Sequence, residues 1–259
     1  MSTNSHKPSK DRILNLFANA TQASIYVAQQ IAALITQQQK QGKLAVLGLA
    51  TGNTPKRVYQ ELVRLHQNEG LSFANVVSFN LDEYYPIYPE DEQSYTYFMQ
   101  EHLFKHVNIK PQHIHIPHTR CETEDILDYC KEFEDKIASF GGLDLQLLGI
   151  GRNGHIGFNE PGSSFDSATR LVNLHAVTRE DAQADFGGLD QVPQQAVSMG
   201  VNTIRQAKRI LLLALGERKS EIVSKALQGE ITPEVPASFL QSLAQVEYVL
   251  DHEAAGEII

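Results

Sequence analysis

The sequence predicts a single α/β domain with a mostly parallel central sheet and helices on both faces, an architecture of the Rossmann type. Three observations lead to this class. Short apolar runs alternate with helical patterns, no internal repeat or low-complexity segment occurs, and the 42% hydrophobic and 20% charged residues are typical of a globular chain. Strand–helix alternation forms parallel sheets, because the chain must cross back over the sheet between strands. We expect residues 1–8 of the 259 to be a disordered tail and residues 9–259 to form the domain.

The first expected element is a long helix from Ser9 to Gly42, indicated by apolar residues at helical spacing such as Ala23, Val27 and Ile31. Gly42 suits the position that follows a helix. Nearly continuous apolar runs then predict strands that are buried on both faces. These strands lie at residues 43–50, 75–80, 143–151, 209–216 and 246–250. A helix that follows residues 51–56 is expected to end near His66. Further helices are expected at residues 94–106, 122–139, 217–228 and 236–243.

Composition excludes several classes of function. A net charge of −9 argues against nucleic-acid binding, which needs a basic surface. The polar N-terminus lacks the apolar core of a signal peptide, and no run of about 18 apolar residues predicts a membrane span. Cys121 and Cys130 form no CxxC pair, so they indicate neither a zinc site nor a redox pair. We therefore expect a cytoplasmic protein whose partner is a small molecule, with no nucleic acid and no membrane.

Four strand ends carry unusual residues, and in open parallel sheets ligands bind beyond the carboxyl ends of the strands. The first is the segment Thr51, Gly52, Asn53, Thr54, followed by Pro55. Gly52 allows a tight turn, Thr54 is a good N-cap and Pro55 suits the first position of a helix. Free amides at a helix start suit a phosphate. A plain strand-to-helix turn is the alternative, and the spacing is not that of a nucleotide-binding Walker loop.

The second and fourth strand ends carry charges. Asp82 and Glu83 follow one strand, and partial burial would raise the pKa of such a carboxyl enough to make it a general base. The alternative is an exposed loop acid or a helix cap. Lys219 follows another strand and could pair with the same phosphate, although a lone lysine is usually solvated.

The third strand end is a loop over residues 149–162 with a high density of glycine, which indicates unusual backbone angles. It contains His155 and Glu160. The carboxylate could orient the imidazole and stabilise its charged form, leaving the other ring nitrogen for proton transfer. A purely structural histidine is the alternative.

A second histidine group, His113, His115 and His118, resembles a metal patch. No acid or cysteine lies nearby in the sequence, and Pro117 interrupts the element. We therefore expect no metal site here.

The segments TGNTP, FNLDEY, GHIGFNEPG, AVSMG and LGERK resemble, in order, the signature segments of the glucosamine-6-phosphate deaminase family. The resemblance spans about residues 43–219. The related 6-phosphogluconolactonases share the fold and the glycine-rich loop, but their segment after Gly-His differs from the IGFNEP present here. The resemblance implies the deaminase and 6-phosphogluconolactonase type of α/β fold, and no cofactor. It also implies conversion of glucosamine 6-phosphate and water to fructose 6-phosphate and ammonium.

The resemblance further implies roles for single residues. His155 would assist ring opening, with Asn153 and Glu160 holding it, and Asp82 would carry a proton between C2 and C1. The phosphate would be held by Thr51, Gly52, Asn53, Thr54 and Lys219.

The sequence departs from some members of the family at three places. Asn153 replaces an acid, and the stretch 181–185 lacks an arginine that contacts the phosphate in some members. In the segment that forms the allosteric site of hexameric members, Ser163 and Arg170 match, but Val172 and Asn173 replace a lysine and a threonine. We therefore expect no allosteric control, and a monomer rather than a hexamer. A lactonase that uses His155 to activate water, and a sugar-phosphate sensor without turnover, stay as alternatives.

Overall fold

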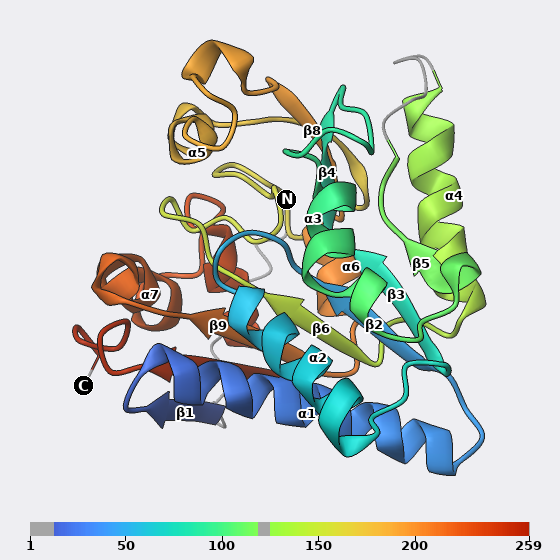
Figure 1. Ribbon diagram of the computed structural model, residues 1–259. Helices are drawn as coiled ribbons and strands as arrows, with labels where there is room; N and C mark the ends of the chain where they lie inside the picture. Colours follow the sequence, from blue (N-terminus) through green and yellow to red (C-terminus); the bar gives the residue numbers. More distant parts are fainter. Residues whose placement is uncertain (1–12, 119–124, 259) are drawn as a thin grey trace.

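The computed structural model describes residues 13–118 and 125–258, so the expected tail at residues 1–8 and Cys121 lie outside the described residues. Within that part of the chain, a seven-stranded sheet has the order β1-β10-β9-β6-β2-β3-β5 (Figure 1). All of its pairings are parallel, which confirms the predicted α/β class. Its strands are β1 (Ile13–Phe17), β2 (Ala45–Leu49), β3 (Val76–Asn80), β5 (Ile114–His115), β6 (Leu145–Leu148), β9 (Ile210–Ala214) and β10 (Val246–Asp251).

Every residue of β2, β3, β6, β9 and β10 is buried, which requires cover on both faces of the sheet. The apolar runs in the sequence reflect this double burial. Helices α1 and α2 lie together over one face (Figure 1). The helices are α1 (Ala20–Lys40), α2 (Lys56–Glu69), α3 (Tyr95–His102), α4 (Ile126–Ser139), α5 (Ala176–Ala182), α6 (Val201–Arg205) and α7 (Ser220–Gln228).

The expected helix from Ser9 is wrong at its start. Residues 13–17 form the edge strand β1, which pairs with β10, and α1 begins only after Asn19. The Asn19 side chain caps this helix by accepting from the Gln22 amide at 3.0 Å. Pairing with the open edge of β10 satisfies the backbone of residues 13–17, and this tertiary pairing outweighs any local helical preference. The C-terminal glycine is confirmed, since Gly42 has a φ of 68°.

Other helix boundaries also differ. Thr54 is not the N-cap of α2, because Pro55 occupies that position without a side-chain hydrogen bond. Three expected α-helical stretches contain 3-10 turns instead, where bonds between residues three apart tighten the chain. These turns are Phe104–His106, Glu217–Lys219 and Pro236–Ser242.

A second, three-stranded sheet was not predicted. Its order is β4-β8-β7, and both pairings are antiparallel. The strands are β4 (Asp82–Tyr85), β7 (Arg170–Asn173) and β8 (Gln195–Ser198). Only Leu81 separates β3 of the large sheet from β4, so the chain passes between the two sheets at this residue. The junction therefore places Asp82 where the two sheets meet.

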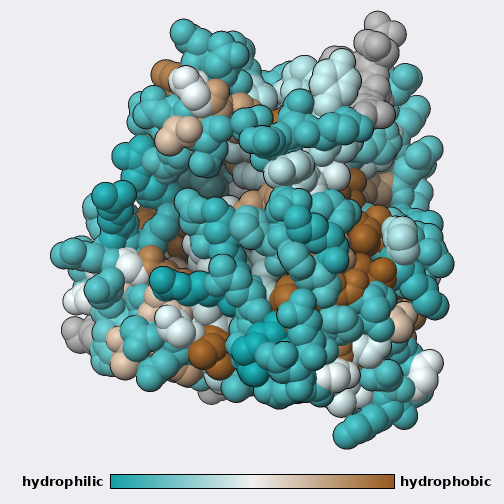
Figure 2. Space-filling model, in the orientation of Figure 1, coloured by the Kyte–Doolittle hydropathy of each residue, from teal (hydrophilic) through white to brown (hydrophobic). Residues whose placement is uncertain are grey.

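Figure 2 shows one face of the molecule covered mostly by hydrophilic residues, with hydrophobic side chains in small scattered groups. None of the described helices has the length and apolar character needed to cross a membrane.

Candidate active site

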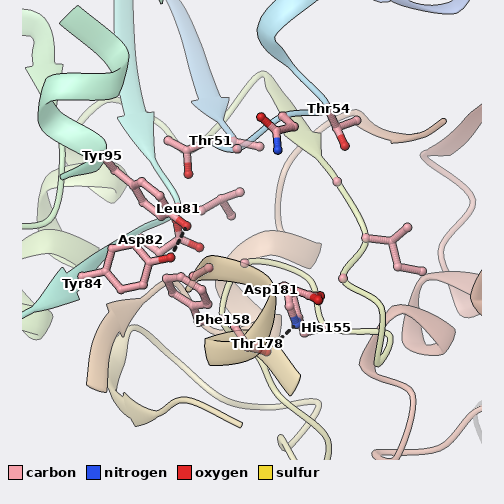
Figure 3. Close-up of a pocket in the computed structure, with 18 of the residues that line it drawn as sticks. Thr51, Thr54, Leu81, Asp82, Tyr84, Tyr95, His155, Phe158, Thr178 and Asp181 are labelled. Atoms are coloured by element: carbon pink, nitrogen blue, oxygen red, sulfur yellow. Dashed lines mark hydrogen bonds between the residues drawn. The ribbon is translucent and has the colours of Figure 1, made fainter. Parts of the chain in front are cut away.

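A cavity of about 230 Å³ lies beyond the carboxyl ends of the parallel strands (Figure 3). The turn between β2 and α2, the junction of β3 and β4, the glycine-rich loop after β6 and the turn after β9 all contribute to it. The four segments that the sequence singled out therefore meet at one place, as the rule for parallel sheets predicts. The cavity is lined by seven of the predicted site residues: Thr51, Gly52, Asn53, Thr54, Asp82, His155 and Lys219. The other two, Asn153 and Glu160, contact His155 rather than the cavity.

One end of the cavity carries groups that suit an anion. Gly52 has a φ of 91°, a conformation that other residues rarely adopt, and it turns the chain from β2 toward α2. Lys219 donates a hydrogen bond from Nζ to the carbonyl oxygen of Ile150 at 2.8 Å, which directs the ammonium toward the glycine-rich loop. Burial lowers the pKa of Lys219, the nearby carboxylate of Asp181 opposes this, and the guanidinium of Arg152 adds to the lowering.

His155 is held from behind by a short chain of polar contacts. Its Nδ1 lies 2.8 Å from Oδ1 of Asn153 and 3.4 Å from Oε2 of Glu160. Asn153 in turn donates from Nδ2 to Oε2 of Glu160 at 2.8 Å. Because the amide oxygen of Asn153 can only accept, Nδ1 of His155 carries the proton, and Nε2 is left as the acceptor. A Cβ atom on Gly151 would lie 2.2 Å from the imidazole, so this ring position needs glycine there.

Glu160 is the charged end of this chain. Burial alone would raise the pKa of its carboxyl, but hydrogen bonds from His155, Thr178 and Asn153, together with the charge of His155, lower it from 4.5 to about 2. Its Oε1 also accepts from the His175 amide at 3.2 Å. The carboxylate therefore stays ionised in the range where a histidine gains and loses its proton.

Asp82 lies on the opposite side of the cavity, as the first residue of β4. Burial raises the pKa of the Asp82 carboxyl, and the negative charge of Glu83 raises it further. Gly157, with a φ of 56°, brings the glycine-rich loop against this carboxyl, since a Cβ there would lie 3.4 Å from Oδ2 of Asp82. The site thus places a buried carboxyl across from an oriented histidine.

Glu83 does not line the cavity but supports it. Its side chain accepts from the amides of Tyr95 and Thr96, each at 2.9 Å, at the start of α3. Burial raises its pKa to about 7, although these amide bonds favour the charged form. Of the two acids that the sequence offered, Glu83 thus binds the first amides of α3, whose N-cap is Ser94, and Asp82 is the acid in the cavity.

The cavity also contains residues that the sequence did not indicate. Tyr95 and Tyr84 bring their hydroxyl oxygens 3.4 Å apart next to Asp82 (Figure 3). On the opposite side, α5 contributes Thr178, whose Oγ1 lies 3.3 Å from Nδ1 of His155, and Asp181. The segment of α5 has no apolar run or glycine cluster, so only the family resemblance at residues 181–185 linked any part of it to the site.

The second histidine group serves the packing of the fold. His113 contacts the carbonyl oxygen of Val76 through Nδ1, and His115 stacks on Phe79 with ring centroids 4.6 Å apart. Burial lowers the pKa of His115 to about 4. Across residues 13–118 and 125–258, no three His, Cys, Asp or Glu side chains gather in a way that could hold a metal ion.

Comparison with known proteins places these features in a family. The model of the family described as glucosamine-6-phosphate isomerases/6-phosphogluconolactonase matches residues 18–248. A glucosamine-6-phosphate deaminase of Clostridium botulinum strain Langeland is 47% identical over 232 residues, covering 90% of this chain and 94% of the relative. The enzyme of the same name from Bacillus velezensis is 45% identical over 230 residues, with 89% and 95% covered.

Solved structures agree with the sequence relatives. A monomeric glucosamine-6-phosphate deaminase has a TM-score of 0.90 at 42% identity, with 95% of this chain and 99% of the other covered. The 6-phosphogluconolactonase of Trypanosoma brucei has a TM-score of 0.77 at 21% identity, with 97% and 100% covered, which shows a shared fold. The chain therefore belongs to the family of glucosamine-6-phosphate isomerases and 6-phosphogluconolactonases.

Proposed function

We propose that this protein is a glucosamine-6-phosphate deaminase, which converts glucosamine 6-phosphate and water to fructose 6-phosphate and ammonium. The observation that carries the proposal is the meeting of Asp82, His155 and Lys219 in one cavity. Relatives at 45–47% identity over about nine-tenths of the chain carry this name, which supports the same assignment.

The phosphate end of the substrate would bind at the turn of residues 51–54 and at Lys219. Backbone amides at the start of α2 and the partly buried ammonium of Lys219 suit a phosphate dianion. Binding energy gained at this end fixes the distant reacting carbons between Asp82 and His155, which lowers the entropic cost of reaching the transition state.

His155 would open the sugar ring. Its Nε2 accepts the proton of the anomeric hydroxyl as the bond between C1 and the ring oxygen breaks, and the imidazolium then passes this proton to the ring oxygen. Throughout, Nδ1–H stays bonded to Asn153. The imidazolium that forms is stabilised by the carboxylate of Glu160, 3.4 Å from Nδ1. Asn153 forms hydrogen bonds with both His155 and Glu160 and fixes their relative positions without adding a charge of its own.

Asp82 would then act on the open chain. The exposed C1 carbonyl makes the C2 proton acidic, and the carboxylate of Asp82 moves this proton from C2 to C1, while O1 gains a proton and the substrate nitrogen loses one. The resulting C2 imine adds water, forms the ketone and releases ammonium. Burial makes Asp82 a stronger base than a solvated aspartate, because the charged form loses hydration.

Purified protein incubated with glucosamine 6-phosphate tests the proposal. Ammonium and fructose 6-phosphate should appear in equal amounts, without added metal or nucleotide. No ammonium, together with hydrolysis of 6-phosphogluconolactone, would assign the lactonase reaction instead. Binding of the sugar phosphate without either reaction would indicate a sensor.

We further propose that the protein works in the cytoplasm as a monomer. The structural neighbour with a TM-score of 0.90 is a monomeric deaminase, which supports this assembly. The mass in solution, measured by light scattering during size-exclusion chromatography, tests the assembly.

A further inference from the structure

A carboxylate lies inside the cavity next to the cations of the phosphate end. Asp181 of α5 lines the cavity (Figure 3), as does Lys219. The Oδ1 atom of Asp181 lies 3.0 Å from Nη2 of Arg152. Arg152 belongs to the glycine-rich loop, whose Ile150 carbonyl accepts the hydrogen bond from Lys219. Two cations and one carboxylate, from three separate parts of the chain, therefore lie close together: Lys219 and Asp181 line the cavity, and Arg152 pairs with Asp181 just outside its lining.

The three charges interact with one another. The negative charge of Asp181 favours the charged form of Lys219, whereas the positive charge of Arg152 opposes it. Asp181 thus offsets the repulsion between the two cations. An anion that bound at the same place would do likewise, because it would attract both Arg152 and Lys219.

We propose that Asp181 and the substrate phosphate compete for Arg152, so that Arg152 is a second phosphate-binding cation and Asp181 sets the affinity of the site. The inference rests on the proposed function, since the phosphate is that of the amino-sugar substrate. The phosphate has the advantage in this competition. It carries more charge than a carboxylate and matches the planar guanidinium with two oxygens.

Exchange of partners at Arg152 costs little. The side chains of Arg152 and Asp181 are 53% and 48% exposed, so water replaces the contacts that Asp181 gives up. Asp181 and Thr178 belong to the same helix, and Thr178 contacts Nδ1 of His155. The exchange therefore links phosphate binding to the position of the helix that packs on His155.

Two neighbouring acids provide matched controls. Glu180 also pairs with Nη2 of Arg152, at 3.2 Å, but it does not line the cavity. Glu180→Gln thus removes an ion pair of Arg152 without changing the charge of the cavity. Asp185 does line the cavity. Asp185→Asn thus measures the general effect of removing a negative charge there.

The test measures two constants of the full chain: the dissociation constant for inorganic phosphate, by calorimetry, and the Michaelis constant for glucosamine 6-phosphate. Asp181→Asn should lower both constants about threefold to fivefold, which means tighter binding, on the scale of a partly exposed ion pair. Arg152→Met should raise both about tenfold, because it removes a charge-assisted contact, and Arg152→Lys should lie between. Glu180→Gln should change neither constant by more than about twofold, and Asp185→Asn should lower them less than Asp181→Asn does. When Arg152 is already replaced by Met, Asp181→Asn should no longer lower either constant.

Two results would overturn the inference: equal effects of Asp181→Asn and Glu180→Gln, or a phosphate affinity that does not depend on Arg152. Circular dichroism and thermal melting check that each variant is folded. If the unchanged protein binds phosphate but releases no ammonium, the proposed function fails, and the calorimetry alone still decides the inference.

Discussion

The two sheets of this protein are stabilised in different ways and supply different parts of the site. The large sheet is parallel, and its central strands are buried on both faces. The small sheet has strands of four residues, and β7 is only partly buried. The large sheet ends in the groups that suit a phosphate, whereas the small sheet and the glycine-rich loop carry the groups that suit proton transfer.

The difference extends to the bonds that hold each part. In the large sheet, backbone pairing and apolar packing fix the strands. At the junction of the small sheet with the glycine-rich loop, side-chain hydrogen bonds fix much of the backbone. Ser198 accepts from the Phe158 amide at 3.0 Å, and Asn159 donates to the carbonyl oxygens of Ile156 and Met199, each at 2.8 Å. Changes on the small-sheet side should therefore affect turnover, and changes at the ends of the large sheet should affect affinity.

The largest expected effect is that of Asp82→Asn. The amide has the same shape but cannot accept the C2 proton, so kcat should fall at least about a hundredfold, the usual scale for losing a general base. The Michaelis constant should stay within about threefold, because Asp82 lies away from the phosphate end. Exchange of the C2 proton with solvent, followed by NMR, should be suppressed as well. Normal exchange in this variant would remove Asp82 from the proton transfer and break the division between the two regions.

The next effect is on stability, through Glu160. The pKa of Glu160 falls from 4.5 to about 2 on folding. A lowered pKa stabilises the fold above pH 4.5, and this contribution is lost as the pH falls from about 4.5 to about 2. Glu160→Gln should therefore lower the free energy of unfolding by about 2–3 kcal/mol at pH 7 and by much less near pH 2.5.

Urea unfolding of both proteins at several pH values measures the effect of Glu160→Gln. A difference that does not change with pH would mean that the Glu160 carboxylate gains nothing from its contact with His155. The polar chain behind His155 would then orient the ring without stabilising its charge.

Lys219→Ala tests the other region. It removes a charge-assisted contact worth roughly 1.5–3 kcal/mol, so the Michaelis constant for the phosphorylated substrate should rise about tenfold or more, with a smaller change in kcat. Arg218→Ala is the matched control, because Arg218 is the exposed neighbour in the same turn and does not line the cavity. If Lys219→Ala and Arg218→Ala raised the Michaelis constant equally, Lys219 would act only as a nearby positive charge and not through direct contact with the phosphate.

The same contrast explains what the sequence could predict. Double burial makes the central strands read as apolar runs, and the rule for strand ends then brings four segments together without knowledge of their contacts. The strands β4 and β8, DEYY and QAVS, are short and partly polar, and their pairing depends on residues far apart in the chain. No local pattern indicates such pairing.

Side-chain geometry was hidden for a related reason. The sequence placed Asn153 and Glu160 near His155, but the amide that bonds both partners is a matter of rotamers and loop angles. Thr178 and Asp181 reach the cavity because α5 folds back over it, and apart from the family resemblance at residues 181–185 the sequence of α5 carries no sign of this. When a polar segment folds back over a cavity, sequence patterns do not predict the contacts that it makes there.

The smallest expected effect is the response to N-acetylglucosamine 6-phosphate, a test of whether the small sheet also carries a regulatory site. Allostery needs a second site whose ligand binds two states unequally, and an anionic ligand needs cations. Arg170 of β7 already donates to Asn159 at 2.9 Å and to Ser163 at 3.2 Å, and Val172 packs against an apolar cluster. A single arginine whose guanidinium already donates to protein acceptors would bind a phosphate only weakly. We therefore expect hyperbolic kinetics and rates that change by less than about twofold when the acetylated sugar is added, measured over a range of substrate concentrations. Sigmoidal curves that the acetylated sugar straightens would contradict this, and would show that the small sheet couples proton transfer to a second ligand.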